Sequence, residues 1–425
     1  IAKSVTTIGN EAFNNFFGKI AFDCNIPDAK WFEGCTFTDI TVGENVTDIT
    51  PEAFANFDGK LTAYCNFFNP AWFNLAQIAE LTIGSTVSDN ALGAYTEFDG
   101  KLIIDSNNFK AEWFDLARVA EVVITENINT IANDTFVDYA GNITVNCDII
   151  SPDWFNGAKI GTITIGEDVR NICGGTFVNC PMLHSFNSKY ASGDGRSLVI
   201  DGRLIAFIPQ DISEYNIPHG VKEIAPEVFK NCSNLTKITI PDSVESIGEG
   251  AFRECTALNG ITLPDSVLYL NASAFEGCIS LASATLSSNL TKVSENAFAN
   301  CRALTEIIIP DSVTEIEKGA FSNCVAMLTA EVGNGVTSVG EDAFTGCLTL
   351  QSITLGEAVE YIGKRAFNDC DGLVGMICRA QTPPTVEYLK FPEELTIYVP
   401  QKTTKTYKKA MGWSNYAKHI KRIKE

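Results

Sequence analysis

The chain has 425 residues, 45% of them hydrophobic, and a formal net charge of −21 at pH 7. This hydrophobic content predicts a folded protein, and the excess of acidic residues argues against a nucleic-acid partner, because phosphate groups attract Lys and Arg. No apolar run approaches the roughly 18 residues of a membrane-spanning helix, so we expect no transmembrane segment.

Residues 1–186 repeat with a step of 41 residues. Tryptophan followed by phenylalanine marks this step at Trp31, Trp72, Trp113 and Trp154. Each unit holds two short β-rich segments, so we interpret it as two coils. Because the tryptophans are strictly periodic, we expect them in the core; exposed in a row, they would favour glycan binding. In this register Ile1 ends a strand, and we expect an export signal or lipid anchor to have preceded it.

Residues 187–216 interrupt the repeat. Two apolar runs, 197–200 and 203–207, flank an Asp-Gly dipeptide, which is a strong signal for a two-residue hairpin turn. We expect a hairpin that projects from one coil. Insertions into repeats often bind ligands, which makes the turn a candidate site consisting of Asp201, Gly202 and Arg203. An irregular coil without a binding role is the alternative.

Residues 217–378 repeat seven times with a step of 23 residues. The step is marked by phenylalanine at Phe229, Phe252, Phe275, Phe298, Phe321, Phe344 and Phe367, and by cysteine at Cys232, Cys255, Cys278, Cys301, Cys324, Cys347 and Cys370. A fixed period of this length predicts a solenoid, in which each coil buries its apolar face against its neighbours. We expect one strand per coil in a shared parallel sheet, and a short helical turn or loop carrying the Phe and Cys on the other side. The two halves are expected to form one continuous solenoid.

Fourteen cysteines are present, and seven of them share one position of the repeat. Stacked coils would point these side chains the same way, a geometry that suits disulfides poorly. We therefore predict a ladder of reduced, buried thiols. Without a Cys-x-x-Cys pair and with three histidines in the chain, a zinc site is disfavoured, and we expect no cofactor.

Residues 379–425 are predicted to form a C-terminal cap made of a strand and a helix. Pro383 and Pro384 end the repeat, 395–399 has a strand pattern, and Lys402 to Ile420 has the pattern of an amphipathic helix. Residues 401–425 hold eight Lys and Arg against one acidic residue. This basic segment is either a solvated face of the helix or a contact with an anionic surface or neighbouring domain.

One face of the predicted sheet must meet solvent, and its positions alternate with the core residues. This face is the candidate ligand-binding site, and it consists of Lys237, Thr239, Thr262, Ser283, Thr285, Glu306, Ile308, Glu331, Ser352 and Thr354. Many of these positions, and their equivalents in the first half, are threonine. Threonine is a good strand former that tolerates water, so the ladder can also be purely structural.

The string from Ile238 to Cys255 reads I-x-I-P-D-S-V-x-x-I-x-x-x-A-F-x-x-C. It resembles the BspA-like bacterial leucine-rich repeats, closely over 217–378 and more loosely over 1–162. The resemblance implies a right-handed α/β leucine-rich-repeat solenoid with one parallel sheet face and short helical turns or loops opposite it. It also implies exposure on, or secretion from, host-associated bacteria and a role in adhesion. It transfers no catalytic residue.

The sequence therefore favours a non-enzymatic cell-surface protein that binds host extracellular or microbial surface proteins. A structural spacer and a glycan-binding surface protein are the alternatives. An enzyme is disfavoured, because no nucleophile–histidine pair and no phosphate-binding loop is recognisable.

Overall fold

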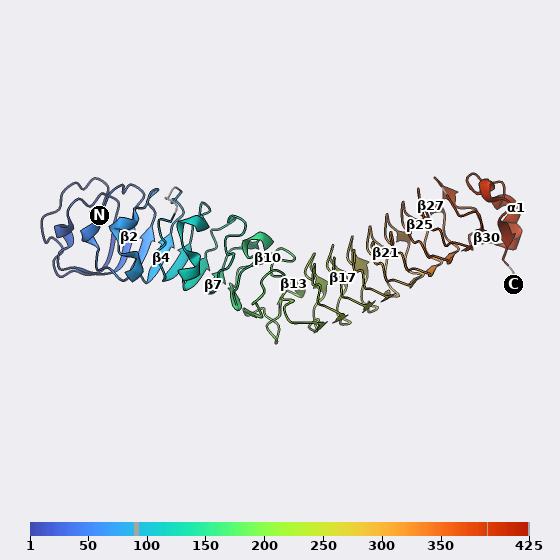
Figure 1. Cartoon of the computed structure of the whole chain (residues 1–425), viewed down its shortest axis with the longest axis horizontal. Helices are drawn as coiled ribbons and strands as arrows, with labels where there is room; N and C mark the ends of the chain where they lie inside the picture. Colours follow the sequence, from blue (N-terminus) through green and yellow to red (C-terminus); the bar gives the residue numbers. More distant parts are fainter. Residues whose placement is uncertain (89–92, 389, 424–425) are drawn as a thin grey trace. The chain divides into compact units, whose positions relative to one another are not determined.

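The computed structural model describes residues 1–88, 93–388 and 390–423. These residues form two compact units. The first comprises Ile1–Ile172 with Thr176–Arg196, and the second comprises Cys173–Gly175 with Ser197–Glu425. Within each unit, successive coils place their strands side by side and parallel (Figure 1). Each unit is therefore a solenoid of stacked coils, as the two repeats predict.

The first unit is built on a nine-stranded sheet in which every neighbouring pair is parallel. Its strands are β1 Phe17–Phe22, β2 Thr36–Val42, β3 Lys60–Ala63, β4 Glu80–Ile83, β5 Lys101–Ile104, β6 Glu121–Ile124, β7 Asn142–Val145, β9 Thr162–Ile165 and β11 Ser185–Asn187. A separate two-stranded sheet pairs β8 Ile149–Ile150 with β10 Asn171–Ile172. Short 3₁₀ helices lie at Ala29–Phe32, Pro51–Ala53, Pro70–Trp72, Leu75–Gln77, Ala111–Trp113, Leu116–Arg118 and Pro152–Trp154.

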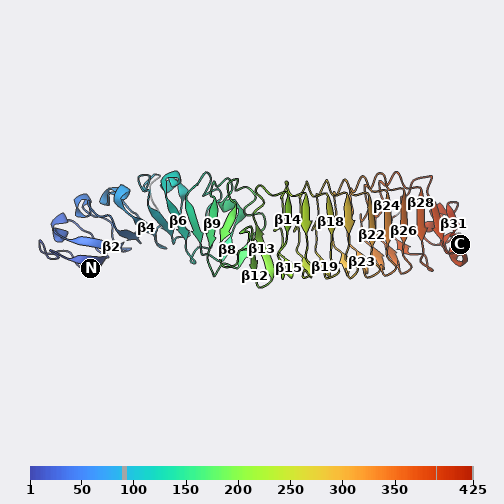
Figure 2. The ribbon, with the colours of Figure 1, turned by 90° about the horizontal axis from the view of Figure 1, so that it is seen from below.

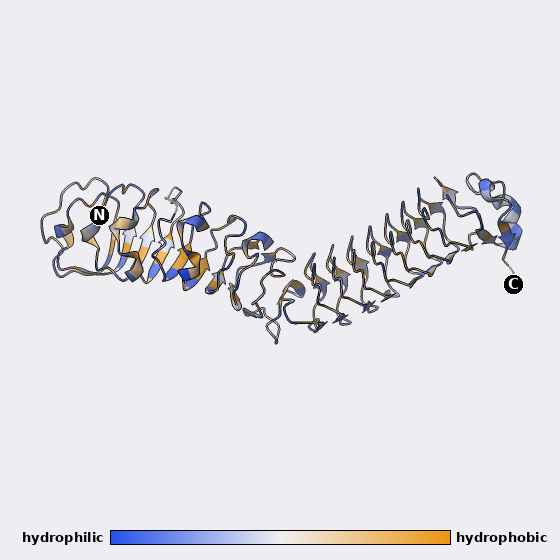
Figure 3. Cartoon of the chain, viewed as in Figure 1, coloured by the Kyte–Doolittle hydropathy of each residue, from blue (hydrophilic) through white to orange (hydrophobic). Residues whose placement is uncertain are grey.

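The four periodic tryptophans are buried, as predicted, and three end a 3₁₀ helix. The phenylalanine after each of them lies in the same core. Phe54 and Phe73 stack with ring centroids 5.2 Å apart, and Phe136 and Phe155 do so at 5.3 Å. In Figure 3 the strands of the first unit carry hydrophobic colouring beside hydrophilic and intermediate parts. The 41-residue period therefore reflects packing, because aromatic side chains of two unlike neighbouring coils stack on each other in the core.

The second unit carries two rows of strands along its coils (Figure 2). The first row holds β14 Glu214–Asn216, β16 Lys237–Thr239, β18 Gly260–Thr262, β20 Ser283–Thr285, β22 Glu306–Ile309, β24 Thr329–Val332, β26 Ser352–Leu355, β28 Gly375–Cys378, β30 Thr396–Val399 and β31 Ile420–Arg422. The second row holds β12 Ser197–Ile200, β13 Arg203–Phe207, β15 Glu223–Ile224, β17 Ser246–Ile247, β19 Tyr269–Leu270, β21 Lys292–Val293, β23 Glu315–Ile316, β25 Ser338–Val339, β27 Tyr361–Ile362 and β29 Thr385–Val386.

The repeated phenylalanines form a column in the core of the second unit. From Phe229 to Phe367 each ring stacks on the next, with centroids 4.9–5.7 Å apart and planes within 14° of parallel. The repeated cysteines are buried beside this column, as predicted. From Cys255 to Cys370 each thiol donates a hydrogen bond of 3.0–3.3 Å to the carbonyl oxygen of a phenylalanine in the preceding coil. The Phe and Cys of each repeat thus connect it to its neighbours.

The helical turn expected around each Phe–Cys pair is a run of tight turns instead. Two positions per coil have φ near +60°, where a right-handed helix cannot continue. These positions are Glu227, Gly250, Ser273, Asn296, Gly319, Asp342 and Arg365, and then Asn231, Glu254, Gly277, Asn300, Asn323, Gly346 and Asp369. The N–H groups of Gly250, Phe252 and Glu254 donate to carbonyls of the next coil, at Ala272, Ala274 and Glu276. Hydrogen bonding between coils replaces the hydrogen bonding of a helix.

The prediction of a continuous helix from Lys402 to Ile420 is wrong. Three short helical segments and a strand occupy this stretch: η8 Gln401–Thr403, α1 Thr404–Tyr407, η9 Trp413–Tyr416 and β31. The helix ends before Gly412, whose φ is +79°. Beyond it the Trp413 indole donates to the Pro384 carbonyl oxygen at 2.8 Å, and Ile420 enters the sheet beside Ile397. Packing of these apolar side chains onto the last coil overrides the helical pattern. Among the described residues, no helix has the length and apolar character of a membrane span.

Thiol labelling tests the buried cysteine ladder. Twelve of the fourteen cysteines are buried, Cys35 is half-buried and Cys173 is exposed. Burial raises the pKa of the Cys324 thiol to about 12, so the reactive thiolate is scarce near neutral pH. We expect a thiol reagent at pH 8 to label Cys173 quickly, the half-buried Cys35 slowly, and the twelve buried thiols only after unfolding. Cys173→Ser should remove the fast phase; a fast phase that persists, or several fast thiols, would contradict this packing.

Candidate functional site

The candidate face is solvent-accessible along its length, since none of its ten residues is buried. Neighbouring strands place them side by side in register. Thr262 pairs with Thr285, and Gly260 pairs with Ser283, across β18 and β20. Behind them Ile238 and Ile261 point into the core. The alternation predicted from the sequence therefore sets both sides of this sheet.

A shallow groove of about 530 Å³ lies on this face, over β16, β18 and β20. Five of the predicted residues line it: Lys237, Thr239, Thr262, Ser283 and Thr285. Gly260 has no side chain, which leaves the hollow between the longer side chains of Lys237 and Ser283. Asp242 and Asn259 contribute polar groups at its border. The groove offers hydroxyl groups, an ammonium and a carboxylate to a ligand.

The other five predicted residues lie outside the groove. Glu306, Ile308, Glu331, Ser352 and Thr354 are on β22, β24 and β26. Ile308 is 63% exposed, an unusual position for a large aliphatic side chain. The structure therefore brings half of the predicted set together in one depression and leaves the other half on a flatter continuation of the same face.

The hairpin is confirmed, with β12 and β13 antiparallel and Asp201-Gly202 at the turn. Both turn residues have positive φ, +51° and +79°, as this type of two-residue turn requires. It does not project as a free insertion, because its strands are largely buried and β13 pairs with β15. The guanidinium of Arg203 donates to both carboxylate oxygens of Glu223, at 3.1 and 3.2 Å. This hairpin is the start of the second strand row, and its one cation already has a partner.

The chemistry available to this face is hydrogen bonding and ion pairing. No group of three or more His, Cys, Asp and Glu residues within 1–88, 93–388 and 390–423 could hold a metal ion. The burial of the tryptophans also removes the aromatic stripe that would have favoured sugar stacking.

The family called BspA type Leucine rich repeat region matches residues 1–96, 105–192, 205–328 and 315–391, with six copies. The chain belongs to this family. No curated protein sequence matches the chain.

Solved leucine-rich-repeat structures resemble this BspA-type chain. A leucine-rich repeat protein from Eubacterium ventriosum is 16% identical, with a TM-score of 0.50, covering 89% of this chain and 91% of that one. One from Bacteroides ovatus is 18% identical, with a TM-score of 0.48 and coverages of 88% and 92%. A leucine rich cell surface protein from Faecalibacterium prausnitzii is 22% identical, with a TM-score of 0.41 and coverages of 80% and 87%. At these identities the likeness concerns the fold.

A charge ladder on the first unit of this BspA-type chain was missed from the sequence. Consecutive strands β1 to β6 carry, in register, a cation and an anion in alternation: Lys19, Asp39, Lys60, Glu80, Lys101 and Glu121. Three pairs are in contact, at 3.4, 3.1 and 3.0 Å. The cations are 41 residues apart and so are the anions, a signal that the repeat already contained. Because the ladder neutralises itself, it stabilises register and leaves little net charge for a ligand.

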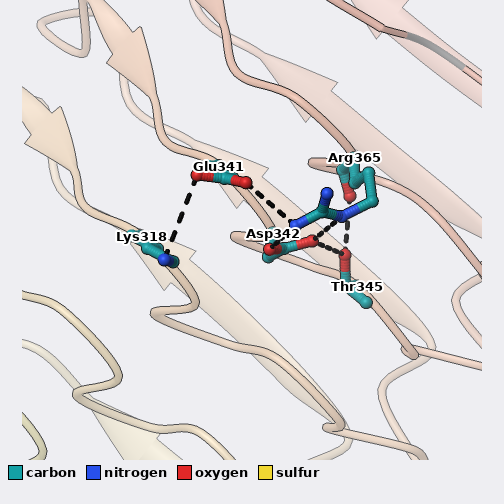
Figure 4. Close-up of polar contacts among 5 residues, drawn as sticks. All are labelled: Lys318, Glu341, Asp342, Thr345 and Arg365. Atoms are coloured by element: carbon teal, nitrogen blue, oxygen red, sulfur yellow. Dashed lines mark hydrogen bonds and ion pairs between the residues drawn. The ribbon is translucent and has the colours of Figure 1, made fainter.

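Arg365 joins two consecutive coils of the BspA-type repeat (Figure 4). Its guanidinium donates to both carboxylate oxygens of Asp342, at 2.8 and 2.6 Å, and to Glu341 at 2.9 Å. Glu341 also lies 4.0 Å from Lys318. Arg365 occupies a positive-φ position that is Gly250 and Gly319 in other coils. These bonds offset the backbone strain that a non-glycine residue meets there.

The Arg365 pair should make stability pH-dependent. Hydrogen bonds from Arg365 lower the pKa of Asp342 below its ordinary value. The contribution is therefore complete above about pH 4, the unfolded value, and is lost as the pH falls through the folded pKa. We expect Arg365→Met to lower the urea midpoint of unfolding at pH 7, and the difference from wild type to shrink below pH 4. Lys318→Met, which removes only the 4.0 Å contact, should cost less; an Arg365→Met loss independent of pH would refute the pairing.

Proposed function

We propose that this chain is a bacterial cell-surface binding module that holds a segment of a host or microbial protein on the groove over β16, β18 and β20. The observation that carries the proposal is the groove itself, five of whose lining residues belong to the strand face predicted from the sequence. Membership of a repeat family whose solenoid faces commonly bind other molecules supports it. Cell-surface location is part of the proposal and rests on the family resemblance.

The groove residues suit a polar, extended polypeptide. Thr239, Thr262 and Thr285 present hydroxyl groups on three consecutive coils, about 4.8 Å apart, and each hydroxyl can donate and accept. Lys237 lies 3.8 Å from Glu214 in an exposed and weak pair, so its ammonium stays accessible. Backbone amides and carbonyls of a bound segment would find partners of both kinds here.

A binding screen tests the proposal. The purified chain is expected to bind saturably, at physiological ionic strength, to at least one member of a panel of extracellular-matrix proteins, mucins and bacterial surface proteins. The double variant Thr239→Arg/Thr262→Arg should weaken that binding by about tenfold or more, because two long charged side chains fill the groove.

The matched control is Thr82→Arg/Thr144→Arg, which places the same substitutions at equivalent strand positions of the first unit. It should leave the affinity unchanged. Binding that ignores the groove variant, or that falls equally in the control, would move the site elsewhere. Absence of any saturable binder, protein or glycan, would leave the structural spacer as the better account.

A further inference from the structure

The last stretch of the C-terminal cap, residues 401–423, carries cations and no acidic residue. Within residues 401–423, the last described stretch of the cap, seven basic residues occur and no Asp or Glu: Lys402, Lys405, Lys408, Lys409, Lys418, Lys421 and Arg422. All seven are exposed. Figure 3 shows the hydrophilic colouring of this region around α1.

These seven cations also have no ion-pair partner in the described part of the chain. Every ion pair found there involves a cation at or before residue 365, including Lys19, Lys101, Arg203 and Arg365. In a chain with net charge −21, anions are abundant, so unpaired cations gathered in one segment stand out. The cap concentrates positive potential where the rest of the chain neutralises it.

The cap holds these cations on an ordered surface. The Tyr407 hydroxyl donates to the Ala380 carbonyl oxygen at 2.9 Å, and the Phe391 N–H donates to the Tyr416 hydroxyl at 3.0 Å. Trp413, bonded to Pro384, is fully buried. A surface hollow of about 440 Å³ lies beside Pro383, and both Lys405 and Lys409 line it. Two ammonium groups therefore flank one depression on a fixed scaffold.

Structural roles account for only part of the charge. Lys421 and Arg422 lie on β31, the last strand of its sheet, where cations discourage edge pairing. Lys405 and Lys409 are not on that strand, and like charges four residues apart repel each other. Solubility does not need them either, because the net charge is already far from zero. A ligand that supplies anions would remove this repulsion.

We propose that the cap binds a linear anionic polysaccharide, with Lys405 and Lys409 at the centre of the site. A hydrophilic polyanion fits because residues 401–423 expose little apolar surface: Tyr407 and Trp413 are buried, Met411 is 86% exposed, and the exposed Tyr388 lies outside this segment. A lipid surface or a protein partner would need an apolar anchor, and bases of a nucleic acid would need an exposed aromatic platform. Sulfate, phosphate or carboxylate groups repeated along a glycan need cations alone.

Dextran sulfate immobilised on a sensor tests this site, with neutral dextran as the reference polymer. The chain should bind dextran sulfate at physiological ionic strength, bind more weakly as salt rises, and ignore neutral dextran. Lys405→Glu/Lys409→Glu should lose about tenfold or more in affinity. The control Lys222→Glu/Lys364→Glu changes the net charge equally at two exposed lysines outside the cap, and should lose less than about twofold.

Equal losses in the two variants, or no binding by the wild-type chain, would overturn the proposal. So would equal or stronger binding to vesicles containing phosphatidylserine or to poly-glutamate, because those results favour a membrane or an acidic protein. Thermal unfolding of both variants should match wild type, since the lysines are exposed. The groove variant Thr239→Arg/Thr262→Arg should retain dextran sulfate binding. The cap site and the groove of the proposed function are therefore tested independently of each other.

Discussion

Replacing Phe298 with alanine is expected to cost about 4 kcal/mol of unfolding free energy. The ring is fully buried and stacks between Phe275 and Phe321, with centroids 5.3 and 5.5 Å away. Alanine removes both contacts and leaves a cavity in a column that stacked coils cannot collapse. Because each coil contacts only its neighbours, hydrogen-exchange protection should fall most in the coils around residues 275–321.

Urea unfolding measures this loss, and Phe67→Ala is the matched control. Phe67 is 52% exposed, so its removal should change stability by less than about 0.5 kcal/mol. A Phe298→Ala loss no larger than that of the control would mean that the phenylalanine column does not hold the second unit together.

Gly59→Ala is expected to cost about 2–3 kcal/mol, although it adds a single methyl group. The added carbon would collide with the backbone carbonyl oxygen of Thr38 in the preceding coil, and would lie 2.8 Å from the Phe57 ring. The backbone oxygen belongs to the sheet and cannot move aside cheaply. Aromatic residues followed two positions later by glycine recur in the first unit, at Phe16–Gly18, Phe57–Gly59, Phe98–Gly100 and Tyr139–Gly141.

Gly9→Ala provides the comparison, because an added carbon at Gly9 meets no atom within 4 Å. Thermal or urea unfolding should show little change for Gly9→Ala and a clear loss for Gly59→Ala. Equal behaviour of the two variants would show that the close approach of these coils is not needed for the fold.

Periodicity made the coil core predictable. A residue that recurs every 23 or 41 positions occupies an equivalent place in each repeat of the stack. The period alone therefore predicted the core positions of the repeated Phe, Cys and Trp residues. The strand face followed from alternation. The charge ladder has the same 41-residue period, as Lys19, Lys60 and Lys101 show. It is recognised only when these lysines are aligned with the acidic residues of the other kind of coil.

The backbone between strands was not predictable in the same way. Its positive-φ positions hold residues as different as Glu227, Ser273, Asn296 and Arg365, so residue type gives no consistent signal. Hydrogen bonds to the next coil decide the conformation, and they exist only in the stack. The prediction of a continuous helix in the cap was wrong for a related reason. Trp413 and Ile420 pack on the last coil, and this packing is more favourable than continuing the helix.

The sequence predicted which strand face carries the candidate site, but it did not predict the groove on that face. Alternation placed Thr239, Thr262 and Thr285 outward, but the groove depends on the missing side chain of Gly260, whose importance appears only beside Lys237 and Ser283. The hairpin was found from Asp201-Gly202, while the pairing of Arg203 with Glu223 depends on contact between strands distant in sequence.

Hydrogen–deuterium exchange of the chain, with and without the partner found in the screen, tests the binding-module proposal most directly. We expect slower exchange in peptides covering β16, β18 and β20, and unchanged exchange in peptides covering β4, β5 and β6 of the first unit. Protection confined to other segments, with the β16–β20 peptides unchanged, would contradict the groove as the binding site.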